Sequence, residues 1–220
     1  MPTNLLNDDG TASMATMIMT SHHGFRRDLA CFARALAEIS RGDTARVGAV
    51  GAEWKRFREA LHGHHTVEDA NLFPSMRAEH AELAATIDVL DAQHRRIDPL
   101  LERGDAVFAD LPAHASDAVA VVGELARLLD EHLELEEASV IPHLRAATQF
   151  PPMPAEMFAM YADGFAWSTT GLAADVVDAI HAMLPAGLVA HIPAARAALD
   201  ARCREVWGYV HTGASRTSVP

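Results

Sequence analysis

The sequence is poor in the features that mark several large classes of protein. It holds only two cysteines, Cys31 and Cys203, which lie far apart and in no close-spaced motif. This scarcity excludes a disulfide framework and favours a reducing compartment. No run of about 18 apolar residues is present, so we expect no membrane-spanning helix. The N-terminus lacks a basic region followed by an apolar stretch, so we expect no secretory signal and a cytoplasmic location.

Basic side chains are also scarce. The chain carries 18 Lys and Arg residues against 30 Asp and Glu residues, which gives a formal net charge of −12. Because binding to phosphate backbones requires clustered Lys and Arg, we expect no nucleic-acid partner. The remaining composition is that of a globular protein, since 50% of the 220 residues are hydrophobic. A chain of this length can bury a sizeable core.

Apolar residues recur at helical spacing along most of the chain, and no segment alternates apolar and polar residues as a strand would. The sequence predicts four long helices, over about residues 13–40, 44–74, 79–103 and 116–147. We expect Asp43 to cap the second helix and Gly104 to end the third, with Pro112 in the loop before the fourth. Four long amphipathic helices with short connections predict an all-α protein, an antiparallel up-down four-helix bundle.

The predicted bundle is flanked by two further segments. Residues 1–12 are polar and are expected to form a loose N-terminal arm. The bundle then covers residues 13–149, and a proline-rich stretch at 150–154 marks the start of a C-terminal helical extension over 150–220. Three weaker helical stretches are expected in this extension, near residues 155–168, 172–184 and 193–210. The extension either packs on the bundle or forms a homodimer contact.

An internal repeat places the same polar residues on the second and fourth helices. The segment His64-x-x-x-Glu68 matches the segment His132-x-x-x-Glu136. In both copies a second acidic residue follows the glutamate, and an apolar-Pro-x-x-Arg stretch comes after it. Every matched position is offset by 68 residues. A duplicated helix pair of this kind predicts two similar half-sites that face each other.

Histidine is unusually frequent, and four histidines occupy core positions. Ten of the 13 histidines precede residue 150. Each helix has one histidine three or four residues after an apolar core residue; these four are His22, His64, His94 and His132. Residues four apart share a helix face, so Glu68 and Glu136 are expected to point inward beside His64 and His132.

Six such side chains in one interior predict bound metal. An isolated ionised carboxylate is costly to bury unless it is paired or bound to a cation. Imidazole and carboxylate ligands suit iron, manganese or zinc, and no thiolate favours a structural zinc site. Four histidines and two carboxylates are too many for one ordinary site, but they can give two ions two histidines each, with both glutamates bridging. The alternative is a metal-free interaction scaffold in which the histidines are merely hydrogen-bonded.

These residues make the sequence similar to the hemerythrin-like (HHE cation-binding) family over about residues 15–147. The resemblance is carried by His22, His64-x-x-x-Glu68, His94 and His132-x-x-x-Glu136, together with the Leu-Phe-Pro and Val-Ile-Pro segments that follow the two acid pairs. The resemblance implies two iron ions with a bridging oxo or hydroxo group, with manganese or zinc as alternatives. It also implies that the partner is a small oxidant, namely O2, peroxide or nitric oxide.

The sequence departs from the oxygen carriers of this family at one position. Their third helix has two histidines four residues apart, whereas the residue four before His94 is Leu90. The departure leaves an open coordination place, which favours peroxide or nitric oxide detoxification over reversible oxygen carriage. The alternative is a module that binds, stores or senses iron or oxygen without turnover.

Other side chains near the predicted ligands can replace one of them or hold them by hydrogen bonds. These are His23, His65, Asp69 and Glu137. His23 is the alternative to His22 as a ligand. His65 is equally compatible with a solvated helix face, and Asp69 and Glu137 with an acidic surface.

Overall fold

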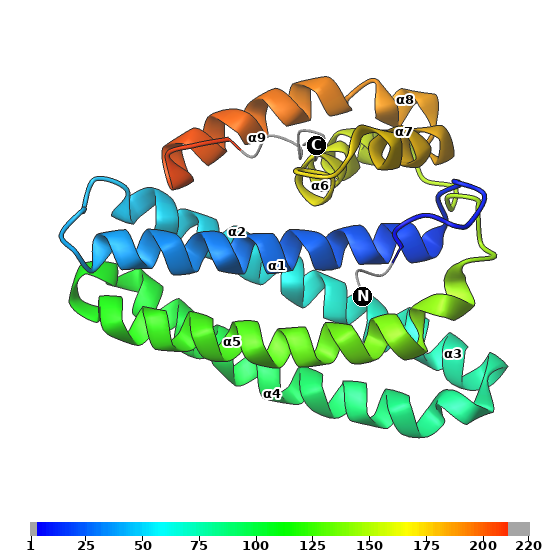
Figure 1. The fold of residues 1–220 in the computed structure, drawn as a ribbon, viewed down its shortest axis with the longest axis horizontal. Coiled ribbons are helices and arrows are strands. Elements are labelled where there is room, and N and C mark those ends of the chain that lie inside the picture. The colour runs from blue at the N-terminus through cyan, green and yellow to red at the C-terminus, as the bar shows by residue number, and fades with distance from the viewer. Residues whose placement is uncertain (1–3, 211–220) are drawn as a thin grey trace, which may run out of the picture. The chain divides into compact units, whose positions relative to one another are not determined.

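The computed structural model describes residues 4–210, and these residues are helical over most of their length (Figure 1). Four helices are long: α1 (Met14–Ile39), α2 (Val47–Val67), α4 (Ala84–Ala109) and α5 (Leu111–Ser139). No strand occurs between residues 4 and 210, so the prediction of an all-α fold is confirmed. Within the described part of the chain, no helix is both long enough and apolar enough to span a bilayer.

The chain divides into two compact units. The bundle unit is residues 25–140, and the terminal unit is residues 1–24 together with residues 141–220. Helix α1 contributes to both, because its first eleven residues, 14–24, belong to the terminal unit and the rest to the bundle unit.

Aromatic side chains fill the core of the bundle unit. Phe32 on α1 makes edge contacts with Trp54 and Phe57 on α2 and with Phe108 on α4. The Trp54 and Phe108 rings are stacked with centroids 4.4 Å apart. Earlier on α1, Phe25 packs against Phe57 and against His64 further along α2. Later residues of α1 therefore contact earlier residues of α2, so these two helices are antiparallel, as predicted.

Helix α4 does not end at Gly104 as predicted but continues to Ala109. Gly104 is in the helix because the Trp54 ring lies against it: a Cβ atom there would be 1.9 Å from Cζ2 of Trp54. The absent side chain thus makes room for a neighbour. Pro112 is in the first turn of α5 rather than in a loop, at a position where its missing N–H is not needed.

The start of α2 also differs from the prediction. Arg46 precedes the helix, and no side chain caps it. Asp43 instead accepts a hydrogen bond from the backbone N–H of Ala45, 3.1 Å away, and so stabilises the turn before the helix.

The predicted second helix is interrupted before Pro74. Helix α2 ends at Val67, a π-helical turn covers Glu68–Leu72, and α3 (Phe73–Glu79) follows with Pro74 in its first turn. A short 3-10 turn (Ala81–Leu83) then leads into α4. A π turn inserts one extra residue per turn, so side chains after it are rotated relative to those before it. The interruption falls on Glu68, one of the predicted ligands.

The terminal unit has its own small core. Ala15 and Met19 on α1 pack with Ile141, which begins a 3-10 turn (Ile141–Leu144). Arg145 donates hydrogen bonds to the backbone oxygens of Leu6 and Asn4, 3.2 and 2.8 Å away. These bonds tie the chain before α1 to the segment after α5.

The C-terminal part of the terminal unit is helical, as predicted. After a 3-10 turn (Ala155–Met157) it consists of α6 (Phe158–Ser168), α7 (Ala174–Met183), α8 (Ala186–Val189) and α9 (Ile192–Trp207). Helix α6 packs on both α8 and α9. Cys31 and Cys203 are both buried, and burial raises the pKa of the Cys31 thiol to about 12.

Candidate metal centre

The last turn of α2 and the first residue of the π turn direct three polar side chains into the bundle unit. His65 is 3% exposed and Glu68 is 2% exposed, and His64 is half-buried with its Nε2 2.9 Å from Oε1 of Glu68. Both histidines follow the buried Leu61, by three and four residues, which are the two spacings that share a helix face. The sequence therefore brings two adjacent histidines to the interior from one helix.

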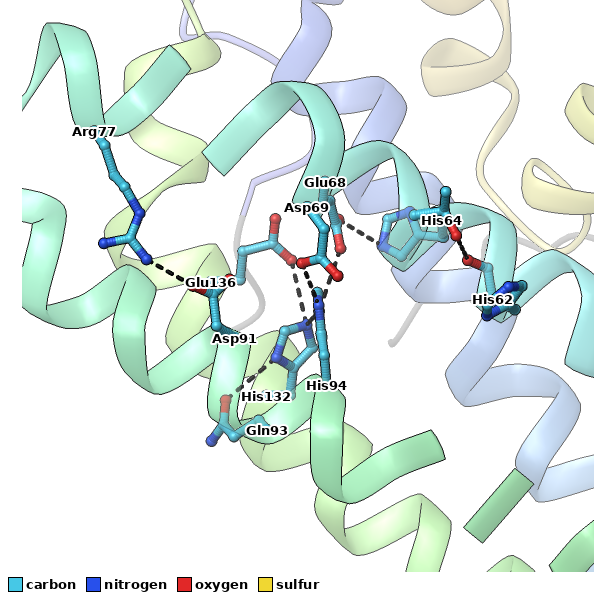
Figure 2. Close-up of polar contacts among 11 residues, drawn as sticks. His62, His64, Glu68, Asp69, Arg77, Asp91, Gln93, His94, His132 and Glu136 are labelled. Atoms are coloured by element: carbon cyan, nitrogen blue, oxygen red, sulfur yellow. Dashed lines mark hydrogen bonds and ion pairs between the residues drawn. The ribbon is translucent and has the colours of Figure 1, made fainter. Parts of the chain in front are cut away.

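His94 on α4 and His132 on α5 complete the arrangement from the opposite side (Figure 2). Both are buried, and their Nε2 atoms lie 3.2 Å apart. Nδ1 of His94 is 2.9 Å from Oδ1 of Asp69, which is in the π turn. Nδ1 of His132 is 3.2 Å from Oε1 of Gln93.

These hydrogen bonds determine where the ring protons lie. Both oxygens are acceptors, so Nδ1 of each neutral imidazole carries the proton and donates it. The Nε2 atoms of His94 and His132 then present their lone pairs at a separation of 3.2 Å. Two lone pairs at this distance repel each other, whereas a cation that accepts both removes the repulsion. The tautomers thus fit metal binding.

Four donors form the first candidate group. The ligand atoms of His65, Glu68, His94 and His132 lie within 4.8 Å of one another, and all four residues are buried. The His65 and His94 rings are stacked with centroids 3.9 Å apart. Oε2 of Glu68 lies 3.6 Å from Nε2 of His94. Three imidazoles and one carboxylate are a donor set that iron, manganese and zinc accept.

A second group within the same unit joins His64, Glu68 and Glu136, whose ligand atoms also lie within 4.8 Å of one another. Glu136 is fully buried, and its Oε2 is 3.9 Å from Nε2 of His132. Glu68 therefore belongs to both groups, and Glu136 reaches from the second toward the first. Carboxylates in these places can bridge two cations, and cations would offset the cost of burying two charges.

Five of the six predicted ligands are thus gathered inside the bundle unit: His64, Glu68, His94, His132 and Glu136. His22 is fully buried, but it lies on the part of α1 that belongs to the terminal unit, and its role as a ligand stays a prediction. Nε2 of His23 donates a hydrogen bond to the backbone oxygen of Thr170, 2.9 Å away.

The two acidic residues that follow Glu68 and Glu136 have different partners. Asp69 accepts a hydrogen bond from His94, which is one of the two roles predicted for it. Glu137 accepts a 2.5 Å hydrogen bond from Arg26 on α1. Burial alone would lower the pKa of Arg26, but its hydrogen bonds to Glu137 and Asp130 outweigh burial and raise that pKa. Arg26 therefore stays charged and neutralises Glu137.

His65 and Gln93 extend the predicted site. The alternative that His65 lies on a solvated face is wrong, because its ring is buried and stacks on the ring of His94. The signal for this was present in the sequence, since His65 follows Leu61 by four residues and precedes Glu68 by three. Gln93 was missed, and no spacing marks it, because its partner His132 is on another helix.

A helical bundle with buried groups of imidazoles and carboxylates defines a cation-binding protein of the all-α class. The chain belongs to the hemerythrin family, because the model of the Hemerythrin HHE cation binding domain matches residues 13–157. No curated protein and no solved structure matches the chain.

Proposed function

We propose that the chain binds two iron ions and that this centre reacts with peroxide, nitric oxide or O2, with consumption of peroxide or nitric oxide as the favoured activity. The observation that carries the proposal is the pair of donor groups that share Glu68. In this proposal one ion is held by His65, His94 and His132, the other by His64 and His22, and Glu68 and Glu136 bridge them.

The assignment of His22 is supported by its neighbour on α1. Phe25 packs on the His64 ring with centroids 5.2 Å apart. His22 precedes Phe25 by three residues and so shares its helix face one turn away. Its side chain is fully buried, as a ligand in a dry interior would be.

Two iron ions in such a donor set would supply the redox chemistry for reaction with a small oxidant. The chain itself provides unequal surroundings, with three imidazoles in the His65 group and two in the His64 group. The smaller number of imidazoles would leave the His64 side more open to an oxidant. Asp69 and Gln93 keep the protons of His94 and His132 on Nδ1, so Nε2 of each ring remains available to the metal.

Reversible binding of oxygen or iron without turnover is the second candidate. The observation that favours it is the position of His65. Leu90 cannot ligate, but His65 restores the number of imidazoles to five, which is the number in the oxygen carriers that the sequence resembles. The absence of a histidine at position 90 is therefore weaker evidence against reversible oxygen binding than the sequence alone indicates.

Metal analysis and rapid mixing test the proposal. Protein purified without added metal should contain two iron ions per chain. Mixing it with peroxide should convert two peroxide molecules into O2 and two water molecules, a reaction that needs no external reductant. Mixing the reduced protein with nitric oxide tests the other favoured activity.

The double variant His64→Ala, Glu68→Ala is the control and should lose both metal and activity. A two-iron protein that is inert to peroxide and nitric oxide but gains and loses a visible absorption band with O2 supports the second candidate instead. A protein with no bound metal rejects both and leaves the metal-free scaffold.

A further inference from the structure

The end of α6 packs against α1 beside His22. Gly24 is buried, and a Cβ atom at this position would be 2.7 Å from Cη2 and Cζ2 of Trp167. Real side chains do not approach so closely, so the Trp167 ring occupies the space that any other residue at position 24 would need. Gly24, two residues after His22, is therefore in contact with the C-terminal extension.

A hydrogen bond reinforces this contact at His23, the residue between His22 and Gly24. Nε2 of His23 donates to the backbone oxygen of Thr170, 2.9 Å away. Thr170 is buried and is followed by Gly171, whose φ of 87° is the left-handed conformation that glycine adopts readily. The turn after α6 thus presents a carbonyl oxygen at a fixed place.

Helix α9 holds that turn. Arg196 donates from Nη2 to Oγ1 of Thr169, 2.8 Å away, and from Nη1 to Oγ1 of Thr170. The two hydroxyls in turn donate to backbone oxygens one turn earlier on α6, those of Phe165 and Ala166. Both threonines are only 2% exposed. Hydrogen bonds therefore run continuously from α9 through the two buried threonines to α1.

We propose that the C-terminal extension positions His22 for metal binding, with Trp167 and the Thr170 carbonyl fixing the two α1 residues that follow it. The inference rests on the proposed function, because it takes His22 as a ligand. A ligand must be held to within roughly 0.5 Å and 10–20° of its productive geometry. Here two neighbours of the ligand are restrained by residues that lie beyond the family match, which ends at residue 157. In this proposal the extension acts on a ligand through the residues next to it on α1.

Two variants weaken the restraint without touching a ligand. Trp167→Ala removes the ring that lies against Gly24, and His23→Leu removes the hydrogen bond to Thr170. His23→Gln keeps an N–H donor and should restore part of the effect. Gly164→Ala is the matched control on α6, because a Cβ atom there meets nothing within 4 Å. Anaerobic titration with Fe²⁺ gives the number and affinity of the ions, and circular dichroism reports the helices.

We expect wild-type protein and Gly164→Ala to bind two ions. Trp167→Ala and His23→Leu should bind one ion normally and the other about 10–100-fold more weakly, the range found when hydrogen-bonded supports of metal ligands are lost. If Trp167→Ala loses its helical signal, His23→Leu and its rescue by His23→Gln decide the matter.

Failure of the inference and failure of the proposed function are separable through His22→Ala. Two ions in wild type, one in His22→Ala and two with unchanged affinity in both extension variants would overturn only the positioning role. Fewer than two ions in wild type, or two in His22→Ala, contradicts the proposed function itself.

Discussion

At the scale of the residue, the two histidines whose Nε2 atoms face each other are supported unequally. His94 donates to a carboxylate, Asp69, and His132 donates to an amide oxygen, that of Gln93. A hydrogen bond to a charged acceptor is roughly twice as strong as one between neutral groups, and a carboxylate makes the imidazole a better donor to metal. His94 is therefore expected to be the stronger ligand of the two.

We predict that Asp69→Ala weakens metal binding more than Gln93→Ala does. Loss of such a support typically lowers metal affinity 10–100-fold. Because the Asp69 side chain is 50% exposed and water can take its place, the lower end, about tenfold, is expected. Asp69→Asn retains an acceptor and should fall between wild type and Asp69→Ala. Competition with a coloured chelator measures the affinity; a larger loss in Gln93→Ala would contradict the ranking.

We also predict that His65→Phe loses one of the two ions. Phenylalanine preserves a flat ring next to His94, where the imidazoles stack, but it has no nitrogen to donate. The His65 group would then retain only two of its three imidazoles. His62→Phe is the control, since His62 is exposed three residues earlier on the same helix. Metal content by elemental analysis decides, and an unchanged content in His65→Phe would show that His65 does not ligate.

At the scale of the element, the two arginines of the internal repeat make similar contacts. Arg77 donates to the backbone oxygen of Ala84 and to Asp88 and Asp91, so it ties α3 to the start of α4. Arg145, offset by 68 residues, ties the segment after α5 to the backbone before α1. Each arginine thus anchors the chain just beyond a His-x-x-x-Glu segment.

The close approach of Trp54 to α4 leads to a stability prediction. Gly104→Ala should destabilise the protein by about 1–3 kcal/mol, the usual cost of forcing extra volume into a packed core, because the new Cβ atom would overlap the Trp54 ring. Gly123→Ala on α5 is the matched control, since nothing lies within 4 Å of its Cβ position. There the better helix propensity of alanine should stabilise by roughly 0.5–1 kcal/mol. Urea unfolding measures both, and equal stabilisation of the two variants would exclude the overlap.

The sequence predicts those parts of the fold and the site that depend on periodicity within one helix. Long amphipathic segments gave the four main helices, and the i, i+4 rule placed Glu68 beside His64 and Glu136 beside His132. Features that arise between helices were not predictable in this way. Glycine is a common stop signal, so Gly104 predicts a helix end, and only the position of Trp54 shows why the helix continues.

The π turn and the support of His132 illustrate the same limit within the site. No residue between Glu68 and Leu72 marks a π turn by composition, although this turn brings Asp69 to His94. Gln93 precedes His94 in the sequence but acts on His132, which is on another helix. Such pairings follow from how the helices are packed, not from the order of residues along one of them.

At the scale of the whole molecule, the buried charges couple metal binding to folding. Glu68 and Glu136 are 2% and 0% exposed, and a carboxylate removed from water without a cation carries a large desolvation penalty. Bound cations offset this penalty in the folded chain only, because the unfolded chain has no preformed site. The loaded protein is therefore expected to be considerably more stable than the metal-free protein.

We predict that removing both ions with a chelator lowers the melting temperature by about 10–20 °C relative to protein with free Fe²⁺ at a hundred times its dissociation constant. Each ion bound at that concentration adds about 2.7 kcal/mol of stability, so two ions add about 5 kcal/mol, and each kcal/mol shifts the midpoint of a chain of this size by roughly 2–4 °C. Calorimetric scans with and without chelator measure the difference.

The double variant Glu68→Gln, Glu136→Gln separates metal binding from other effects of the chelator. Glutamine is nearly the same size as glutamate but brings no charge to be desolvated, so without metal this variant should melt at or above the temperature of metal-free wild type. It lacks the bridging carboxylates, so added Fe²⁺ should leave its melting temperature unchanged. Equal melting temperatures for wild type with and without chelator would mean that the buried glutamates are stabilised by the protein alone, and the coupling of metal to folding would be refuted.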